Sequence, residues 1–149
     1  KTIDDYADAK VEDIEKYIRT LGLYKAKSKN IVGMANMLRD VYDYEIPQTR
    51  EELEKLPGVG RKTANVVLSV GFNVPAIAVD THVERVAKMF GLAELTDSPL
   101  QVEKSLMSIF PMESWGKIHH QLIHLGRYKL PARGERTIDP ELEKLLVLK

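Results

Sequence analysis

The 149-residue sequence is 44% apolar and 30% charged and has a net charge of zero, so the chain can bury a core and fold as one unit or as two small lobes. It contains no cysteine, which excludes disulfides, thiolate zinc sites and iron–sulfur clusters held by thiolates. No apolar run approaches the roughly 18 residues of a membrane-spanning helix, and the first residues lack the pattern of a signal peptide, so nothing supports export.

The first half of the chain has the spacing of amphipathic helices. Apolar residues recur three and four positions apart over residues 11–21 and again over residues 31–41. Thr49 and Glu52 match a capping box, in which the hydroxyl accepts a backbone N–H and the carboxylate reaches back to the start of the helix. These signals predict several consecutive helices in the first half of the chain.

The second half continues the helical pattern. Ser98 precedes Pro99, which suits the first position of a helix because its missing N–H is not needed there. Further helices are predicted over residues 114–125 and 140–146. Only residues 74–79 are short, apolar and β-branched enough to suggest a strand, and they have no partner run for a sheet. The predicted fold class is therefore all-α.

Two helical lobes are predicted, over residues 1–73 and 74–149. Their junction is placed at residues 73–75, because Gly71 can end one helix and Pro75 prevents that helix from continuing. The first lobe would carry two helices joined by a glycine-containing turn, over residues 49–71.

This turn lies in the most informative segment, Leu-Pro-Gly-Val-Gly-Arg-Lys-Thr-Ala-Asn-Val at residues 56–66. Gly58 and Gly60 permit positive φ and a close approach of the backbone to another molecule. The helix predicted to follow directs its unpaired N–H groups and the positive end of its dipole toward the turn, which favours an anion such as a DNA phosphate. The glycines alone also fit an ordinary corner between two helices, but Arg61 and Lys62 at the start of the helix favour anion binding.

Residues 56–67, followed by Ala-Val-Asp-Thr-His-Val at residues 78–83, resemble the helix-hairpin-helix DNA glycosylases, and within them the endonuclease III branch. Weaker similarity extends over most of the chain, through residues 11–128. The resemblance implies an all-α, helix-hairpin-helix glycosylase-like fold of two helical lobes with the active-site cleft between them. It also implies an enzyme that removes oxidised pyrimidines from duplex DNA and cleaves the strand at the abasic site, with Lys62 and Asp80 as its catalytic residues.

The chemistry implied for Lys62 is consistent with its place in the sequence. A neutral amine that displaces a damaged base at C1′ of the sugar forms a Schiff base, which makes elimination of the 3′ phosphate easy. Desolvation favours the neutral amine, and on a helical wheel Lys62 stands at the flank of the stripe of Val59, Val66 and Val70, so partial burial is expected. From periodicity alone, a surface lysine beside the core is the simpler interpretation.

Asp80 directly follows the apolar residues 76–79. Thr81 and Glu84 match a complete capping box, which would leave Asp80 one residue outside the helix without a structural role. In an alternative register Asp80 is itself the cap. As a functional group, its carboxylate can accept the proton of the amine and stabilise positive charge that develops on the sugar.

The residues predicted to contact DNA lie in the hairpin, at the start of the helix after Asp80 and in a later Gly-Arg-Tyr segment. They are Gly58, Val59, Gly60, Arg61, Thr63, His82, Arg127 and Tyr128. His120 and His124 lie one helical turn apart, but no third ligand is evident nearby, so no metal site is predicted.

Two features depart from the endonuclease III pattern. Members of that branch follow the Gly-Arg-Tyr segment with four spaced cysteines that hold a [4Fe–4S] cluster, whereas here Leu130 stands at the first of these positions, so neither the cluster nor another cofactor is expected. The family's N-terminal helices, with their Ser-Ala-Gln-x-Thr-Asp signature, have no counterpart before Lys1. Because Lys1 is not methionine, we expect a fragment, a processed form or a shortened chain.

The sequence therefore predicts a DNA N-glycosylase with abasic-site lyase activity, a monomer that acts on duplex DNA with damaged bases or abasic sites. It is expected in the cytoplasm, at the nucleoid, of a bacterium or archaeon, or in the nucleus of a eukaryote. Two alternatives stay open. One is a helix-hairpin-helix module that binds DNA without turnover, and the other is a monofunctional glycosylase in which Asp80 activates water.

Overall fold

The computed structural model describes residues 1–134 and 137–147, and over these residues the chain is helical without a strand. The elements in chain order are α1 (Ile3–Ala7), α2 (Val11–Ile18), α3 (Tyr24–Asp40), α4 (Arg50–Leu53), α5 (Arg61–Val66), the π-helical η1 (Val67–Gly71), α6 (Thr81–Met89), α7 (Pro99–Ile109), the 3-10 turn η2 (Met112–Ser114), α8 (Trp115–His124), the π-helical η3 (Leu125–Lys129) and α9 (Pro140–Glu143). None of the helices in the described ranges is long and apolar enough to span a bilayer. The predicted all-α fold class is confirmed.

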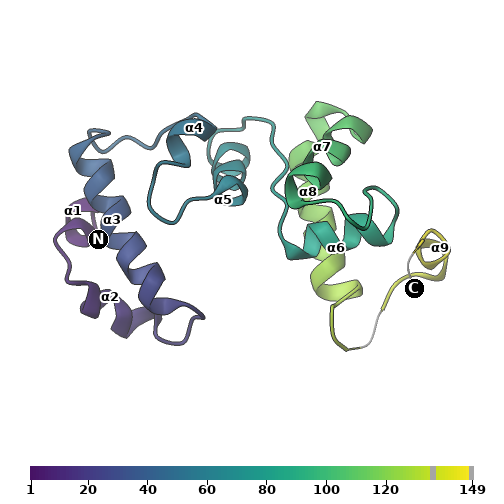
Figure 1. Cartoon of the computed structure of the whole chain (residues 1–149), viewed down its shortest axis with the longest axis horizontal. Coiled ribbons are helices and arrows are strands. Elements are labelled where there is room, and N and C mark those ends of the chain that lie inside the picture. The colour runs from purple at the N-terminus through teal and green to yellow at the C-terminus, as the bar shows by residue number, and fades with distance from the viewer. Residues whose placement is uncertain (135–136, 148–149) are drawn as a thin grey trace. The chain divides into compact units, whose positions relative to one another are not determined.

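The chain forms two compact units, Lys1–Ala64 and Asn65–Lys149. Figure 1 shows the first unit in purple to teal and the second in teal to yellow. The lobe boundary predicted between residues 73 and 74 stays a prediction.

In the first unit, α1 and α2 pack against the long helix α3 (Figure 1). The apolar spacing predicts α2 well. The helix α3, however, begins at Tyr24, seven residues before the predicted apolar run. The apolar pattern misses its first turns because they are basic and mostly exposed. Near the other end of α3, Arg39 Nη1 donates a 2.8 Å hydrogen bond to Asp8, and Asn36 donates one of 3.1 Å to the carbonyl of Ala7. These contacts fix the end of α1 against α3.

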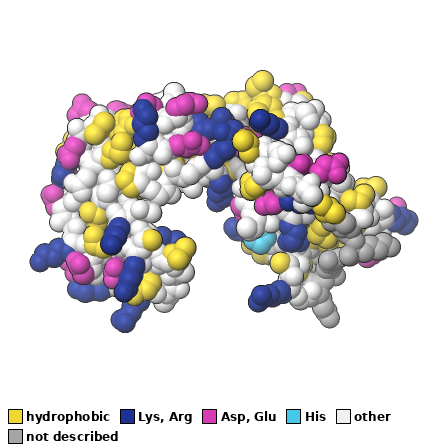
Figure 2. Space-filling model, in the orientation of Figure 1, with side chains coloured by type: hydrophobic (Ala, Val, Ile, Leu, Met, Phe, Trp, Pro, Cys, Tyr) yellow, Lys and Arg dark blue, Asp and Glu magenta, His cyan; other side chains and the backbone are white. Residues whose placement is uncertain are grey.

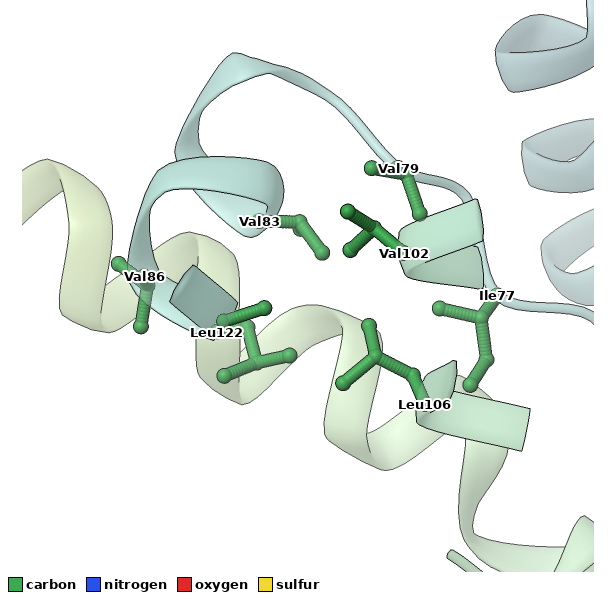
Figure 3. Packing of buried hydrophobic residues seen from close by; sticks show 8 residues of the cluster. Ile77, Val79, Val83, Val86, Val102, Leu106 and Leu122 are labelled. Carbon is green, nitrogen blue, oxygen red and sulfur yellow. The ribbon is translucent and has the colours of Figure 1, made fainter. Parts of the chain in front are cut away.

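In the second unit, α6, α7 and α8 surround one apolar core (Figure 3). Its buried residues are Ile77, Val79, Val83, Val86, Ala87, Val102, Leu106 and Leu122. Ile77 and Val79 come from the extended segment before α6, where the sequence suggests a strand. No strand forms there in the described chain; residues 76–79 are buried because they pack between helices instead of pairing.

Two helices, α8 and α5, change their pitch before they end. α8 continues as the π-helical turn η3, so the predicted helix over residues 114–125 runs on to Lys129. α5 likewise continues as η1 to Gly71. A π-helical turn bonds residue i to i+5, so the side-chain register of an α-helix does not carry across it.

Candidate active site and nucleic-acid interface

The predicted hairpin forms between α4 and α5. Gly58 has a φ of +79°, and Val59 donates its N–H to the carbonyl of Leu56 at 3.0 Å. The first hydrogen bond of α5 runs from Ala64 to the carbonyl of Gly60 at 2.9 Å. The earlier N–H groups of the helix therefore have no acceptor within it and face the turn.

The two hairpin glycines have different surroundings. A Cβ built on Gly58 would lie 2.6 Å from Nδ2 of Asn30 on α3, so both the positive φ and the close approach of Asn30 require glycine. Gly60 does not adopt positive φ, and a Cβ built there would meet no heavy atom within 4 Å. The backbone at Gly60 is therefore accessible to another molecule.

A groove of about 260 Å³ lies beside the hairpin in the first unit. It is lined by Ile18, Leu21, Lys27, Asn30, Ile31, Met34, Pro57, Gly58, Val59 and Thr63. Three of the predicted DNA-contacting residues, Gly58, Val59 and Thr63, thus share one surface with Lys27. Lys and Arg side chains also gather over α2 and the start of α3 in Figure 2.

Lys62 lies on the first turn of α5 and is exposed, so the expected partial burial is wrong for the chain as described. The stripe used for that expectation does not hold, because η1 begins at Val67 and turns Val70 outward to 60% exposure. The buried side of α5 is formed by Ala64 and Asn65. The residues of its own unit therefore do not bury the Lys62 amine.

Asp80 is the N-cap of α6. Its Oδ1 accepts hydrogen bonds from the backbone N–H groups of His82 at 2.9 Å and Val83 at 2.8 Å. The predicted capping box of Thr81 and Glu84 is therefore wrong, and the alternative register holds. Glu84 instead pairs with Lys88 one turn further along the helix, at 2.7 Å. Asp80 thus has a structural role as a helix cap. Both of these hydrogen bonds go to Oδ1, and neither uses Oδ2.

Three predicted DNA-contacting residues lie on or beside η3 in the second unit. A Cβ built on Gly126 would lie 2.8 Å from Cβ of His82, so His82 lies directly against the start of η3. Arg85 Nη2 donates a 2.9 Å hydrogen bond to the carbonyl of Gly126. Arg127 and Tyr128, which follow on η3, are exposed. The pairing of Lys62 in the first unit with Asp80 in the second stays a prediction.

The histidines of α8 are engaged in local contacts. His120 Nδ1 lies 2.7 Å from the carbonyl of Gly116, and the ring of His124 packs against that of Tyr128 with centroids 4.9 Å apart. In residues 1–134 and 137–147, no group of three or more His, Cys, Asp or Glu side chains is arranged to hold a metal.

The residues after Tyr128 do not fit a thiolate-held iron–sulfur cluster. The sequence contains no cysteine. Leu130, at the first cluster position implied by the resemblance, is fully buried against Met89 and Leu146. This region therefore offers apolar packing where the cluster would need sulfur ligands.

Leu23 is a further exposed residue, outside the motifs that the sequence singles out. Its side chain is 81% exposed and its backbone is left-handed, with a φ of +59°, which is uncommon for a leucine. Strained, exposed residues often have functional roles, and apolar side chains of this kind insert between bases in many DNA complexes. Its only sequence signal is the Leu-Gly-Leu turn before a basic helix. Leu23 is therefore a candidate for contact with bases.

The chain is similar to a family of DNA repair proteins and to several of its members. A model of the HhH-GPD superfamily base excision DNA repair proteins matches residues 1–112. Endonuclease III of Bacillus subtilis (strain 168) is 50% identical over 145 residues, which cover 97% of this chain and 66% of that protein. Endonuclease III of Escherichia coli (strain K12) is 45% identical over 126 residues, 85% of this chain and 59% of that protein. The chain thus spans less than two thirds of the length of these curated relatives.

Among solved structures, a trapped covalent intermediate of endonuclease III and DNA, in an estranged-adenine complex, is similar with a TM-score of 0.92. That protein is 51% identical, and the match covers 98% of this chain and 68% of that chain. A non-covalent complex of endonuclease III and DNA also has a TM-score of 0.92, with 50% identity over 99% of this chain and 69% of that chain.

Proposed function

The chain belongs to the HhH-GPD superfamily of base excision DNA repair proteins, and from this membership we propose that it is a DNA N-glycosylase with abasic-site lyase activity. Its proposed substrate is duplex DNA that carries oxidised pyrimidines or abasic sites. The observation that carries the proposal is the hairpin, in which the tight turn at Gly58 is followed by a helix with Lys62 on its first turn.

Lys62 is the proposed nucleophile. The target nucleotide is first extruded from the base stack, since its C1′ is otherwise out of reach. The amine bonds to C1′ as the bond to the base breaks, and opening of the sugar ring at the C1′–O4′ bond then gives a Schiff base, which allows β-elimination of the 3′ phosphate. Because Lys62 is exposed, bound duplex supplies the desolvation that favours a neutral amine. The covalent intermediate trapped for the related endonuclease III is of the kind such a nucleophile forms.

Asp80 is the proposed acceptor of the amine proton. Its Oδ1 holds the N-terminus of α6, and within the described residues Oδ2 makes no hydrogen bond. An anchored carboxylate with one oxygen left for chemistry suits a group that takes a proton and stabilises positive charge on the sugar. Amine and carboxylate chemistry supply each step, so no resident cofactor takes part in this proposal.

The DNA backbone is held from both units. In the first unit, the hairpin from Gly58 to Gly60 offers main-chain N–H groups, with Arg61 and Thr63 beside it; in the second, His82, Arg127 and Tyr128 contact the strand. Main-chain and basic contacts to phosphates position a protein on DNA without reading its sequence. The protein acts in this scheme as a monomer on the genome, in the cytoplasm of a bacterium or archaeon or in a nucleus.

Borohydride trapping on a duplex with one abasic site tests the proposal. The wild-type chain should be captured covalently, because the reductant fixes the Schiff base, and Lys62→Ala should abolish capture. Lys55→Ala is the matched control, since Lys55 is an exposed lysine on the same hairpin whose ammonium pairs with Glu52. It should be captured like the wild type.

Two other outcomes support the alternatives. Intact binding of the abasic duplex without capture or strand cleavage supports a DNA-binding module. Release of a damaged base without capture supports a monofunctional glycosylase, in which Asp80→Asn would then abolish base release. Duplexes that carry thymine glycol, uracil or 8-oxoguanine identify the lesion that is removed, and the proposal expects release of thymine glycol.

A further inference from the structure

The exposed basic turn of the second unit is held in place by hydrogen bonds to its backbone carbonyls. This turn consists of Arg127, Tyr128 and Lys129, whose side chains are all exposed. It ends a helical segment, where backbone carbonyls lack intrahelical partners. Thr137 supplies two of these partners: its N–H donates to the carbonyl of Lys129 at 2.9 Å, and its Oγ1 donates to the carbonyl of Tyr128 at 3.2 Å.

The residue after the basic turn is anchored in an apolar cluster. Leu130 is fully buried and packs with Met89 at the end of α6 and with Leu146 near the C-terminal end of the described chain. Ile138 and Phe90 pack against the same cluster. The turn is therefore fixed on one side by hydrogen bonds and on the other by packing.

The C-terminal segment is itself attached to α6. Val147 donates its N–H to the carbonyl of Met89 at 2.8 Å. Gly91, with a φ of +66°, lies so close that a Cβ on it would come within 3.3 Å of the Val147 side chain. Figure 1 shows α9, in yellow, in this segment. Residues that flank α9 thus connect the end of α6 to the basic turn.

We propose that Thr137, Ile138, Leu146 and Val147 form a C-terminal clamp that positions the basic turn for contact with DNA phosphates. The proposal rests on the proposed function, in which Arg127 contacts DNA. A long basic side chain binds a phosphate better when its backbone is already fixed, because less conformational freedom is lost on binding. Apolar packing around Leu130 thereby fixes this segment without the cysteine ligands that an iron–sulfur cluster would need.

Leu146→Ala and Thr137→Val test the clamp. Leu146→Ala removes most of one buried side chain of the cluster; Thr137→Val keeps the shape of Thr137 but removes the Oγ1 bond to Tyr128. Amide hydrogen exchange over residues 126–130 in the unbound protein should become about tenfold faster in Leu146→Ala, because local opening becomes easier. Thr137→Val should show a smaller increase. Leu145→Ala is the control, since Leu145 is 62% exposed and lies outside the clamp.

The same variants should bind an abasic duplex less tightly. We expect about a fivefold loss of affinity for Leu146→Ala, and the slope of log affinity against log salt should be smaller by about one for each phosphate that the basic turn no longer neutralises. Leu145→Ala should match the wild type. Circular dichroism melting verifies that each variant is folded at the assay temperature, and Thr137→Val serves as the test if Leu146→Ala does not fold.

Unchanged exchange over residues 126–130 overturns the clamp, as does faster exchange with unchanged affinity and salt slope. Covalent capture through Lys62, measured in parallel, separates the two proposals. Capture in the wild type with no effect of the clamp variants overturns the clamp and leaves the proposed function standing. Absence of capture in the wild type overturns the lyase proposal, while the exchange and affinity results still decide the clamp.

Discussion

The side chain of Asn30 lies against the α-carbon of Gly58, so that a Cβ built on Gly58 would come within 2.6 Å of Nδ2 of Asn30. This contact joins α3 to the hairpin within the first unit. Together with the φ of +79°, it leaves no room for a side chain at Gly58. The hairpin is therefore shaped by a residue that lies 28 positions earlier in the sequence.

Gly58→Ala should destabilise the first unit. The methyl group is strained at positive φ and collides with Asn30, so we expect the free energy of unfolding to fall by about 1–3 kcal/mol. Urea titration measures this loss. An unchanged urea midpoint would show that the hairpin adjusts without cost.

Gly60→Ala should separate stability from binding. A Cβ at Gly60 meets no atom of the protein within 4 Å, so we expect stability to stay within about 0.5 kcal/mol of the wild type. If DNA approaches the backbone there, the added methyl group should weaken duplex binding several-fold. Titration of a labelled duplex tests this, and equal affinity for the variant and the wild type would contradict the predicted contact.

Gly126→Ala should push η3 away from α6. The new Cβ would lie 2.8 Å from Cβ of His82 and 3.2 Å from the Val86 side chain, in a well-packed region. Overpacking of this kind typically costs about 1–3 kcal/mol in the free energy of unfolding. Gly71→Ala is the matched control, because a Cβ there meets nothing within 4 Å. Equal thermal stabilities of the two variants would contradict the prediction.

Asp80 should respond differently to two substitutions. Asp80→Asn keeps an N-cap acceptor, so stability should be close to that of the wild type, while strand cleavage should fall because the carboxylate is lost. Asp80→Ala should lose cleavage and also about 0.5–2 kcal/mol of stability. Single-turnover cleavage and urea titration are measured on both variants. Strand cleavage by Asp80→Asn at the wild-type rate would show that Asp80 only caps α6 and takes no part in the chemistry.

The hairpin should lose stability in acid through Glu52. Hydrogen bonds from Lys55 first and Tyr42 second lower the pKa of Glu52 below its ordinary value of 4.5. A lowered folded-state pKa stabilises the protein above the unfolded value, and this contribution is lost as the pH falls through the lowered pKa.

Glu52→Gln should therefore be less stable than the wild type at neutral pH, and the difference should shrink as the pH falls below 4.5, the ordinary pKa of the carboxyl. Urea titrations across this range measure it. Glu51→Gln is the control, because Glu51 is an exposed neighbour on the same helix. A difference between wild type and Glu52→Gln that is the same at every pH would contradict the prediction.

The helical class and the hairpin could be predicted from the sequence because both depend on local spacing and on glycine. The cap of α6 could not, since Asp80 and Thr81 offer competing registers and only the folded backbone selects between them. The exposure of Lys62 follows from which side of α5 is buried, and the folded chain buries Ala64 and Asn65. The roles of Asn30 and Leu130 arise from contacts between residues far apart in the chain.

Under the proposed function, the openness of the backbone at Gly60 bears on how damaged sites would be found. Main-chain amides meet every phosphate alike, so a hairpin that grips DNA through them holds an intact stretch as readily as a lesion. Discrimination then rests on whether a nucleotide leaves the helix easily, which is least costly for one already mispaired or damaged. In this proposal, backbone contacts that do not depend on the bases would let the hairpin bind DNA of any sequence.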